Sequence, residues 1–421
     1  MPEHDTSPTP ASPTGASAGA RGEPTAARWA MAAIFFVNGM IMASYFVRVP
    51  SLKVEHGLTE GQLGLLLIVM PVSALLSMQL AGNLTARVGS AWIARVTAVG
   101  LSLSMFGIGA ADSVVYLVLA LVVFGLIDGL LDVSMNAQAV AVERAAKRPI
   151  MNSCHAAWSI GAVIGSSFGG LAMRLEWSIA QHYLLAGAFL ALVAAVAGRW
   201  TLPAGADRAP EQADKGSERV GWRTGWTGRV VLLGAMGATV LLCEGAIGNW
   251  SGVFLHEDHG APLAVASTGY IGFTVLQVAG RLVGDRLHER YGAPALVRWS
   301  SAIAILGMAL VVFGPSPVPV IAGFTVVGAG VSVLLPVVFS AVGHSGASDS
   351  GTHNAAVALS RFTTMTYSGL LMGPAVIGWL AEWIGLTWTL GFLLVLMVGV
   401  MLNAGATATA NRESEKESPA A

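Results

Sequence analysis

The feature that most restricts the fold of this chain is a series of long apolar runs, each of about 18 to 25 residues. A helix of that length, rising about 1.5 Å per residue, crosses a hydrocarbon core about 30 Å thick. Breaks rich in charge, Pro or Gly separate twelve such runs. The runs cover residues 28–48, 60–81, 92–110, 114–140, 151–173, 179–199, 229–251, 265–284, 295–313, 318–340, 355–380 and 386–404. We therefore predict an all-α membrane protein with twelve transmembrane helices.

The composition also indicates a protein that lies mostly in lipid. Hydrophobic residues make up 54% of the chain and charged residues 11%, whereas a soluble protein carries about 25% charged residues. The net charge of −1 provides no basic surface, so we assign no nucleic-acid partner. Cys154 and Cys243 fall in or beside apolar runs, which favours packing over a disulfide or metal site. We expect no cofactor, and a monomer whose partners are the bilayer, protons and a small solute.

The chain divides into two halves with polar segments around them. Residues 1–27 are rich in Pro, Ser, Thr and Ala, which predicts a disordered tail. They lack the features of a signal peptide, so we expect the first helix to be retained. Residues 201–228 are dense in charge, Pro and Gly and predict a linker. The linker joins six-helix bundles at 28–200 and 229–404, and a tail follows at 405–421.

The distribution of basic residues predicts the orientation. Of the 23 Lys and Arg residues, only Arg48, Lys53 and Arg174 lie on odd-numbered connections, and the other 20 lie on the opposite side. Basic residues gather on the cytoplasmic side of the inner membrane, so we place both termini and the linker there. Tryptophans near span ends predict an interfacial aromatic belt. They are Trp29, Trp92, Trp177, Trp200, Trp250, Trp299, Trp379 and Trp388.

The two halves are related in sequence. The segment GNLTARVGS begins at Gly82, and DRLHERYGA begins 203 positions later at Asp285. The matched pairs are Leu84 with Leu287, Arg87 with Arg290, and Gly89 with Gly292. A glycine pattern that begins at Gly161 in the fifth span recurs from Gly369 in the eleventh. The duplication predicts two pseudo-symmetric six-helix bundles with a site between them near the bilayer midplane.

These residues make the chain resemble the major facilitator superfamily over residues 28–404. In that family the loop after the second helix reads Gly-x3-Asp-Arg-x-Gly, followed by a basic pair. Here Gly82, Arg87 and Gly89 match, but Ala86 replaces the acid and the basic pair is missing. The resemblance implies a secondary transporter that works by alternating access.

The matching loop of the second half retains an acid and a base at Glu289 and Arg290. The resemblance implies a cytoplasmic gate that involves these residues and Arg87. Nearby, Arg281 and Asp285 are spaced i and i+4 and predict an ion pair on one helix at the cytoplasmic end, where we count them with the gate residues.

The fifth-span glycines resemble the drug/proton antiporter motif Gly-x3-Gly-Pro-x2-Gly-Gly, with Ser166 in place of Pro. This resemblance slightly favours efflux over uptake. The alternative is that the glycines only allow two helices to approach closely.

Ionisable groups at membrane depth are costly and usually face the bundle interior. In the fourth span Asp128, Asp132 and Asn136 are spaced i, i+4 and i+8, which places them on one helix face. We expect that face to line the central cavity, with Asp128 in protonation or substrate binding. For Asp132 a structural ion pair or a helix cap is the alternative.

The seventh span contains Glu244, which is the best single candidate for a proton site because it lies deep in the span. The matching position of the first span is Asn38, so both helices offer a polar group at similar depth. Asn249 and Trp250 follow, where an amide and an aromatic ring can hold a solute. For Trp250 an interfacial anchor is the alternative.

Four further residues are candidates for the cavity wall. Arg361 can bind an anionic substrate or a carboxylate, or can extend to the cytoplasmic surface. His155 and Trp158 share one face of the fifth span and either pack or line the cavity. Gln277 in the eighth span is a possible hydrogen-bond donor to a solute.

The sequence contains no GxxxxGK[ST] loop, which argues against direct drive by ATP and for coupling to protons. We expect a transporter, not an enzyme, for a sugar or drug-like solute. A non-transporting receptor on the same fold remains an alternative. An intramembrane aspartyl protease is disfavoured because Asp128 and Asp132 lie on one helix, whereas such a pair must converge face to face.

Overall fold

The structure is a computed structural model that describes residues 19–147, 150–202, 225–347 and 352–411. All regular structure in these residues is helical. The helices are α1 (Gly19–His56), α2 (Glu60–Val88), α3 (Ser90–Gly109), α4 (Val114–Ala146), α5 (Met151–Arg174), α6 (Ile179–Gly198), α7 (Gly228–Glu257), α8 (Leu263–Tyr291), α9 (Ala293–Phe313), α10 (Pro317–Val331), α11 (Leu334–Ala347), α12 (Thr352–Leu402) and the 3₁₀ helix η1 (Ala404–Asn411). Helices satisfy every backbone group internally, as a lipid environment requires.

The described residues confirm the twelve predicted crossings, although the helices are divided differently. Eleven helical segments are long and apolar enough to span a membrane. One of them, Ala358–Leu402, contains two crossings, because Gly385 has a φ of 77° and bends the chain inside α12. Another, Pro317–Val342, is a single crossing that is interrupted between α10 and α11.

Two predicted boundaries differ from the structure. Helix α1 begins at Gly19 rather than residue 28; residues 1–18 lie outside the described part. The expected C-terminal tail includes η1, where Thr407 and Thr409 are buried. Most of the predicted linker, residues 203–224, also lies outside the described part.

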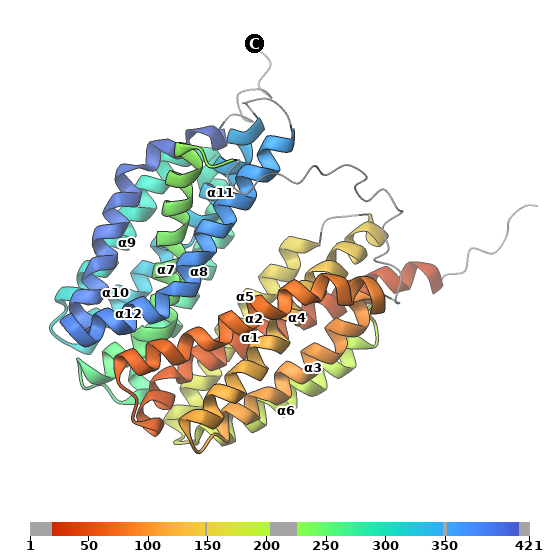
Figure 1. Cartoon of the computed structure of the whole chain (residues 1–421), viewed down its shortest axis with the longest axis horizontal. Coiled ribbons are helices and arrows are strands. Elements are labelled where there is room, and N and C mark those ends of the chain that lie inside the picture. The colour runs from red at the N-terminus through yellow and green to blue at the C-terminus, as the bar shows by residue number, and fades with distance from the viewer. Residues whose placement is uncertain (1–18, 148–149, 203–224, 348–351, 412–421) are drawn as a thin grey trace, which may run out of the picture.

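Figure 1 shows two helical bundles, α1–α6 and α7–α12, that meet at one end and diverge toward the other. We call the meeting end, where α1 leads into α2, the α1–α2 end. The other is the linker end, where α6 stops and α7 begins. Between the bundles, α1 packs against α7, α2 against α12, and α5 against α8.

Glycines mark the relationship between the halves. Gly89 (φ 94°) joins α2 to α3, and Gly292 (φ 73°) joins α8 to α9 at the matching position. Positive φ favours glycine, which explains why the repeated loop motif keeps this residue. In the close helix pairs, a Cβ at Gly161 would meet the Phe36 carbonyl of α1, and a Cβ at Gly369 would meet the Ala238 carbonyl of α7.

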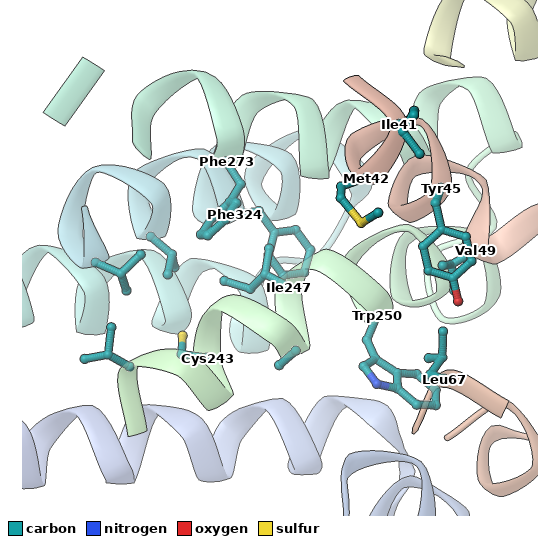
Figure 2. Close-up of a cluster of buried hydrophobic side chains, with 14 of the residues drawn as sticks. Ile41, Met42, Tyr45, Val49, Leu67, Cys243, Ile247, Trp250, Phe273 and Phe324 are labelled. Carbon is teal, nitrogen blue, oxygen red and sulfur yellow. The ribbon is translucent and has the colours of Figure 1, made fainter. Parts of the chain in front are cut away.

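The exposed tryptophans fit the predicted aromatic belt in most cases. Six of them are 53% to 69% exposed: Trp29, Trp92, Trp200, Trp299, Trp379 and Trp388. The expectation that Trp250 belongs to this belt is wrong, because its side chain is fully buried. The central helix α7 packs against the other half at this level, so Trp250 faces protein rather than lipid. Figure 2 shows it beside Leu67 of α2 and close to Val49 of α1.

Candidate functional site

The first half contains a hydrogen-bonded chain through three helices. Asn38 on α1 donates its amide Nδ2 to Asp128 Oδ1 on α4 at 2.9 Å. The indole Nε1 of Trp158 on α5 donates to Asn38 Oδ1 at 2.8 Å. Asn38 is only 4% exposed, so both ends of its amide are used inside the bundle. The three residues, all named from the sequence, therefore form one group, which we call the Asp128 group.

The donor and acceptor pattern of this group is fixed by chemistry. An indole N–H can only donate, so the Asn38 oxygen must face Trp158. The Asn38 nitrogen then faces Asp128 as a donor. A carboxylate oxygen accepts this bond, and so does the carbonyl oxygen of a neutral carboxyl. Asp128 can therefore gain or lose a proton without breaking its contact with Asn38.

Asp132 and Asn136 lie on α4 on the linker side of Asp128. Asn136 Nδ2 donates to the Asp132 backbone carbonyl at 2.8 Å and to Asp132 Oδ1 at 3.3 Å. The charge of Asp132 also acts on His155 of α5. The His155 ring packs edge-on against Phe35 at 5.2 Å, and the residue as a whole is exposed. Both readings of His155, packing and lining, fit this position.

The second half places its acid beside a cation. Glu244 Oε2 on α7 lies 3.5 Å from Arg281 Nη2 on α8, with side-chain exposures of 17% and 34%. Gln277, one turn earlier on α8, is adjacent to the same carboxylate. Glu244 Oε1 and Gln277 Nε2 are both buried and without a hydrogen-bond partner. We call these three residues the Glu244 group.

One expected pairing stays a prediction. The sequence predicts that Arg281 pairs with Asp285 on the same helix, and the side chain of Asp285 lies outside the described residues. The structure pairs Arg281 with Glu244 of the neighbouring helix.

Electrostatic interactions connect the two groups across the space between the halves. Arg281 acts on His155 of the first half. Tyr367 on α12, which is 48% exposed, lies within the fields of both Asp132 and Glu244. The acidic side chains of the two halves therefore face a common region. Tyr367 was not identified from the sequence. The available signal was a tyrosine within an apolar span.

Three other candidates lie elsewhere. The Arg361 guanidinium lies 6.0 Å from the centre of the Trp226 ring, just before α7 begins at the linker end. Asn249 donates to the Gly245 carbonyl of its own helix at 2.8 Å. Trp250 packs in the apolar cluster of Figure 2 together with Tyr45 and Leu67.

Comparison with known proteins identifies the family. The profile of the Major Facilitator Superfamily matches residues 31–356. The chain belongs to the major facilitator superfamily. A protein from Sinorhizobium fredii named as the uncharacterized transporter y4wD is 32% identical over 84% of this chain and 90% of its own length. Membrane protein MosC from Rhizobium meliloti is 31% identical over 89% of this chain and 88% of its own length.

Solved superfamily structures share the fold at low sequence identity. The nucleoside transporter NupG superposes with a TM-score of 0.69 at 17% identity, covering 91% of this chain and 98% of its own. A D-xylose-proton symporter gives a TM-score of 0.70 at 13% identity, covering 91% and 97%. Both likenesses establish the superfamily fold and leave the solute open.

The residues that match the superfamily loop motif lie at the linker end. Arg87 is exposed near the end of α2, and Glu289 and Arg290 are exposed near the end of α8. The Arg290 guanidinium lies 5.4 Å from the centre of the Tyr291 ring. Their role in a gate stays a prediction.

Sequence reasoning missed the polar contacts at the α1–α2 end. Lys53 there contacts Glu257 of the other half, and Thr59 contacts Glu382. Lys53 had been counted only as one of three basic residues on its side of the membrane. The sequence signal for this cluster was a single lysine close to acidic residues between the first two apolar runs.

Proposed function

We propose that this superfamily member is a secondary active transporter that moves a small polar solute across the cytoplasmic membrane by alternating access. Proton movement drives the transport, and Asp128 carries the coupling proton. The solute binds between the halves, where the Asp128 group and the Glu244 group face each other. The Asp128–Asn38 bond is the observation that carries the proposal.

The partner of Asp128 is neutral, and this supports its role as the proton carrier. Transfer of an uncompensated carboxylate into a membrane interior costs several kcal/mol, so such a group tends to hold a proton. Protonation of Asp128 removes its charge and keeps the Asn38 bond. Glu244 differs because its protonation would leave Arg281 without its acid. The Arg281 contact therefore shifts the coupling role from Glu244, the first choice on sequence, to Asp128.

The Glu244 group is better suited to bind solute. Glu244 Oε1 can accept a hydrogen bond and Gln277 Nε2 can donate one, and both are buried without partners. A hydroxyl-bearing or amine-bearing solute that enters from the linker side would satisfy such atoms. A sugar-like or drug-like solute fits this chemistry, as the transport of a nucleoside or of D-xylose by two structural neighbours also suggests.

The direction of transport rests on the fifth-span glycines, which favour efflux only slightly. Gly161 and Gly165 face carbonyl groups of α1, which supports a packing role for the motif. We retain efflux as the proposed direction. The excess of basic residues supports termini and a linker on the cytoplasmic side, so the diverging end opens inward.

Transport assays on the purified protein test this proposal. A thermal-stability screen of nucleosides, sugars, amines and drug-like cations first identifies a binding solute, because a ligand of the folded state raises its melting temperature. Proteoliposomes are then loaded with that solute, and an acidic exterior is imposed. We expect solute efflux together with acidification of the lumen, reported by an enclosed pH-sensitive dye.

Two outcomes would contradict the proposal. Net solute efflux without any proton movement would exclude proton coupling. Binding without counterflow would indicate a receptor on a transporter fold instead of a carrier.

A further inference from the structure

The α1–α2 end is held closed by one lysine that joins the halves. Lys53 near the end of α1 is 6% exposed. Its Nζ lies 2.5 Å from Glu257 Oε1 on α7 and 3.0 Å from Glu60 Oε1 on α2. Glu60 and Lys53 belong to the first half and Glu257 to the second. Separation of the halves at this end therefore breaks the Lys53–Glu257 ion pair.

A second contact crosses the halves a short distance away. Glu382 on α12 accepts hydrogen bonds from Thr59 Oγ1 at 2.5 Å and from the Gly61 backbone N–H at 3.1 Å. Thr59 is the N-cap of α2, so the carboxylate of one half covers the positive end of a helix of the other. This contact is also lost when the end opens.

Glycines permit the close approach beneath these charges. A Cβ on Gly64 of α2 would lie 2.7 Å from the Pro374 carbonyl of α12. A Cβ on Gly378 would lie 2.9 Å from Gly64 Cα. Behind this crossing, Trp250 lies beside Leu67 in the apolar cluster (Figure 2). The closed end thus combines apolar packing with charged groups held at a fixed spacing.

The charges of the cluster do not balance. Two carboxylates share the single ammonium of Lys53, since Glu60 Oε1 and Glu257 Oε1 lie 3.0 Å and 2.5 Å from its Nζ. Two like charges held near one cation repel each other, and a proton on one of the two acids removes this repulsion.

The neighbouring groups reinforce this imbalance. Asp258 follows α7, and its partial burial, with a smaller contribution from Glu60, raises its pKa against the opposing effect of His259. Glu382 adds a further negative charge from α12. An acid whose pKa is raised by closure favours the closed form at low pH and opposes it as the pH rises.

We propose that Lys53, Glu60 and Glu257 form a proton-operated outer lock, which binds a proton from the extracellular side as the halves close over it. Closure of this end opens the linker end, so an external proton drives the carrier toward its inward-facing form. Both symport and antiport require this direction of movement. The inference rests on the proposed function and orientation, and it adds a second proton site to Asp128.

Distance measurements on the full-length protein test the lock without any solute. Spin labels are attached at Asp112→Cys and Ser316→Cys, which lie at exposed positions on the outer connections of the two halves, after Cys154 and Cys243 are replaced by serine. Electron–electron double resonance then gives the distance distribution in nanodiscs between pH 5 and 8.5. We expect the long, open distance to gain population as the pH rises, by at most about tenfold per pH unit for one proton.

Variants separate the lock from general charge effects. Glu257→Gln mimics the protonated acid and should keep the short distance at all pH values, and Glu60→Gln provides a second test should the first variant fold poorly. Glu55→Gln is the matched control, because Glu55 is exposed at the same end and should leave the pH response intact. A wild-type distribution that is unchanged with pH, or a Glu257→Gln protein that responds like wild type, would overturn the inference.

The outcome is distinguishable from failure of the proposed function. If the label distances change with pH but solute transport is not coupled to protons, the outer lock is supported and the proposed function is contradicted. If protons drive solute transport but the label distances do not change with pH, the proposed function is supported and the outer lock is contradicted.

Discussion

The Asp128 group and the Glu244 group lie in facing halves of one pseudo-symmetric fold, and their carboxylates have different partners. Asp128 is held by a neutral amide, Asn38, at 2.9 Å. Glu244 is held by a cation, Arg281, at 3.5 Å. Asn38 on α1 and Glu244 on α7 occupy matching positions, so the first half carries its acid on its fourth helix and the second half on its first.

This difference between partners supports a division of proton exchange and solute recognition between the two halves. A carboxyl with a neutral partner changes charge at modest cost, whereas a carboxylate with a cation keeps its charge unless both partners change. We therefore propose proton exchange at Asp128 and solute recognition at Glu244.

The largest expected effect is that Asp128→Asn separates proton-driven solute accumulation from solute exchange. Asp128→Asn mimics the neutral acid and retains a partner for Asn38, so solute exchange should persist while accumulation driven by a pH gradient falls at least about tenfold. Glu244→Gln should instead lower exchange and accumulation together, because it alters binding. Both rates are measured in proteoliposomes with and without an imposed gradient.

The same assay can reverse the assignment. If Glu244→Gln loses accumulation and keeps exchange while Asp128→Asn behaves like wild type, the acid of the second half carries the proton. Glu176→Gln, on the exposed connection between α5 and α6, serves as a control for the loss of one negative charge.

A smaller effect should appear in stability. Arg281→Met leaves Glu244 buried without a cation and should destabilise the protein by about 1–2 kcal/mol, a modest cost because the arginine is 34% exposed. The double variant Arg281→Met/Glu244→Gln should recover most of that loss. Thermal unfolding in detergent measures both. Equal loss in the single and double variants would show that the uncompensated Glu244 carboxylate is not the cause of the loss.

The sequence was sufficient for the architecture because each crossing is a local property. Apolar length alone locates twelve crossings, and the glycine that repeats after 203 residues, Gly89 and Gly292, locates matching turns between helices. Periodicity on α4 also brought Asp128 and Asp132 to one face. These features depend on residues close together in the chain.

Contacts between helices could not be predicted in the same way. The Glu244–Arg281 pair joins α7 to α8, and the Lys53–Glu257 pair joins α1 to α7. Each depends on the relative rotation and depth of two helices, which periodicity on either helix leaves undetermined. The belt assignment of Trp250 failed for the same reason, since its distance from a span end did not reveal which side of α7 faces the other half.

The smallest effect concerns Trp158, which is linked to Asp128 only through Asn38. Trp158→Phe keeps the aromatic volume against α1 and removes the N–H that Asn38 Oδ1 accepts. The amide oxygen then lacks its partner, which costs about 1–2 kcal/mol when the site stays dry and less when water enters. With its orientation no longer fixed, Asn38 can turn its oxygen toward Asp128, an arrangement that requires a protonated carboxyl. We therefore expect the pH profile of proton-driven transport to shift upward by less than about one unit, with solute affinity unchanged.

Asn38→Asp, which replaces the amide by an acid, should shift the profile further in the same direction because a second negative charge opposes ionisation of Asp128. A profile that stays fixed in both variants would show that Asn38 positions helices only and that its bond to Asp128 does not govern the proton.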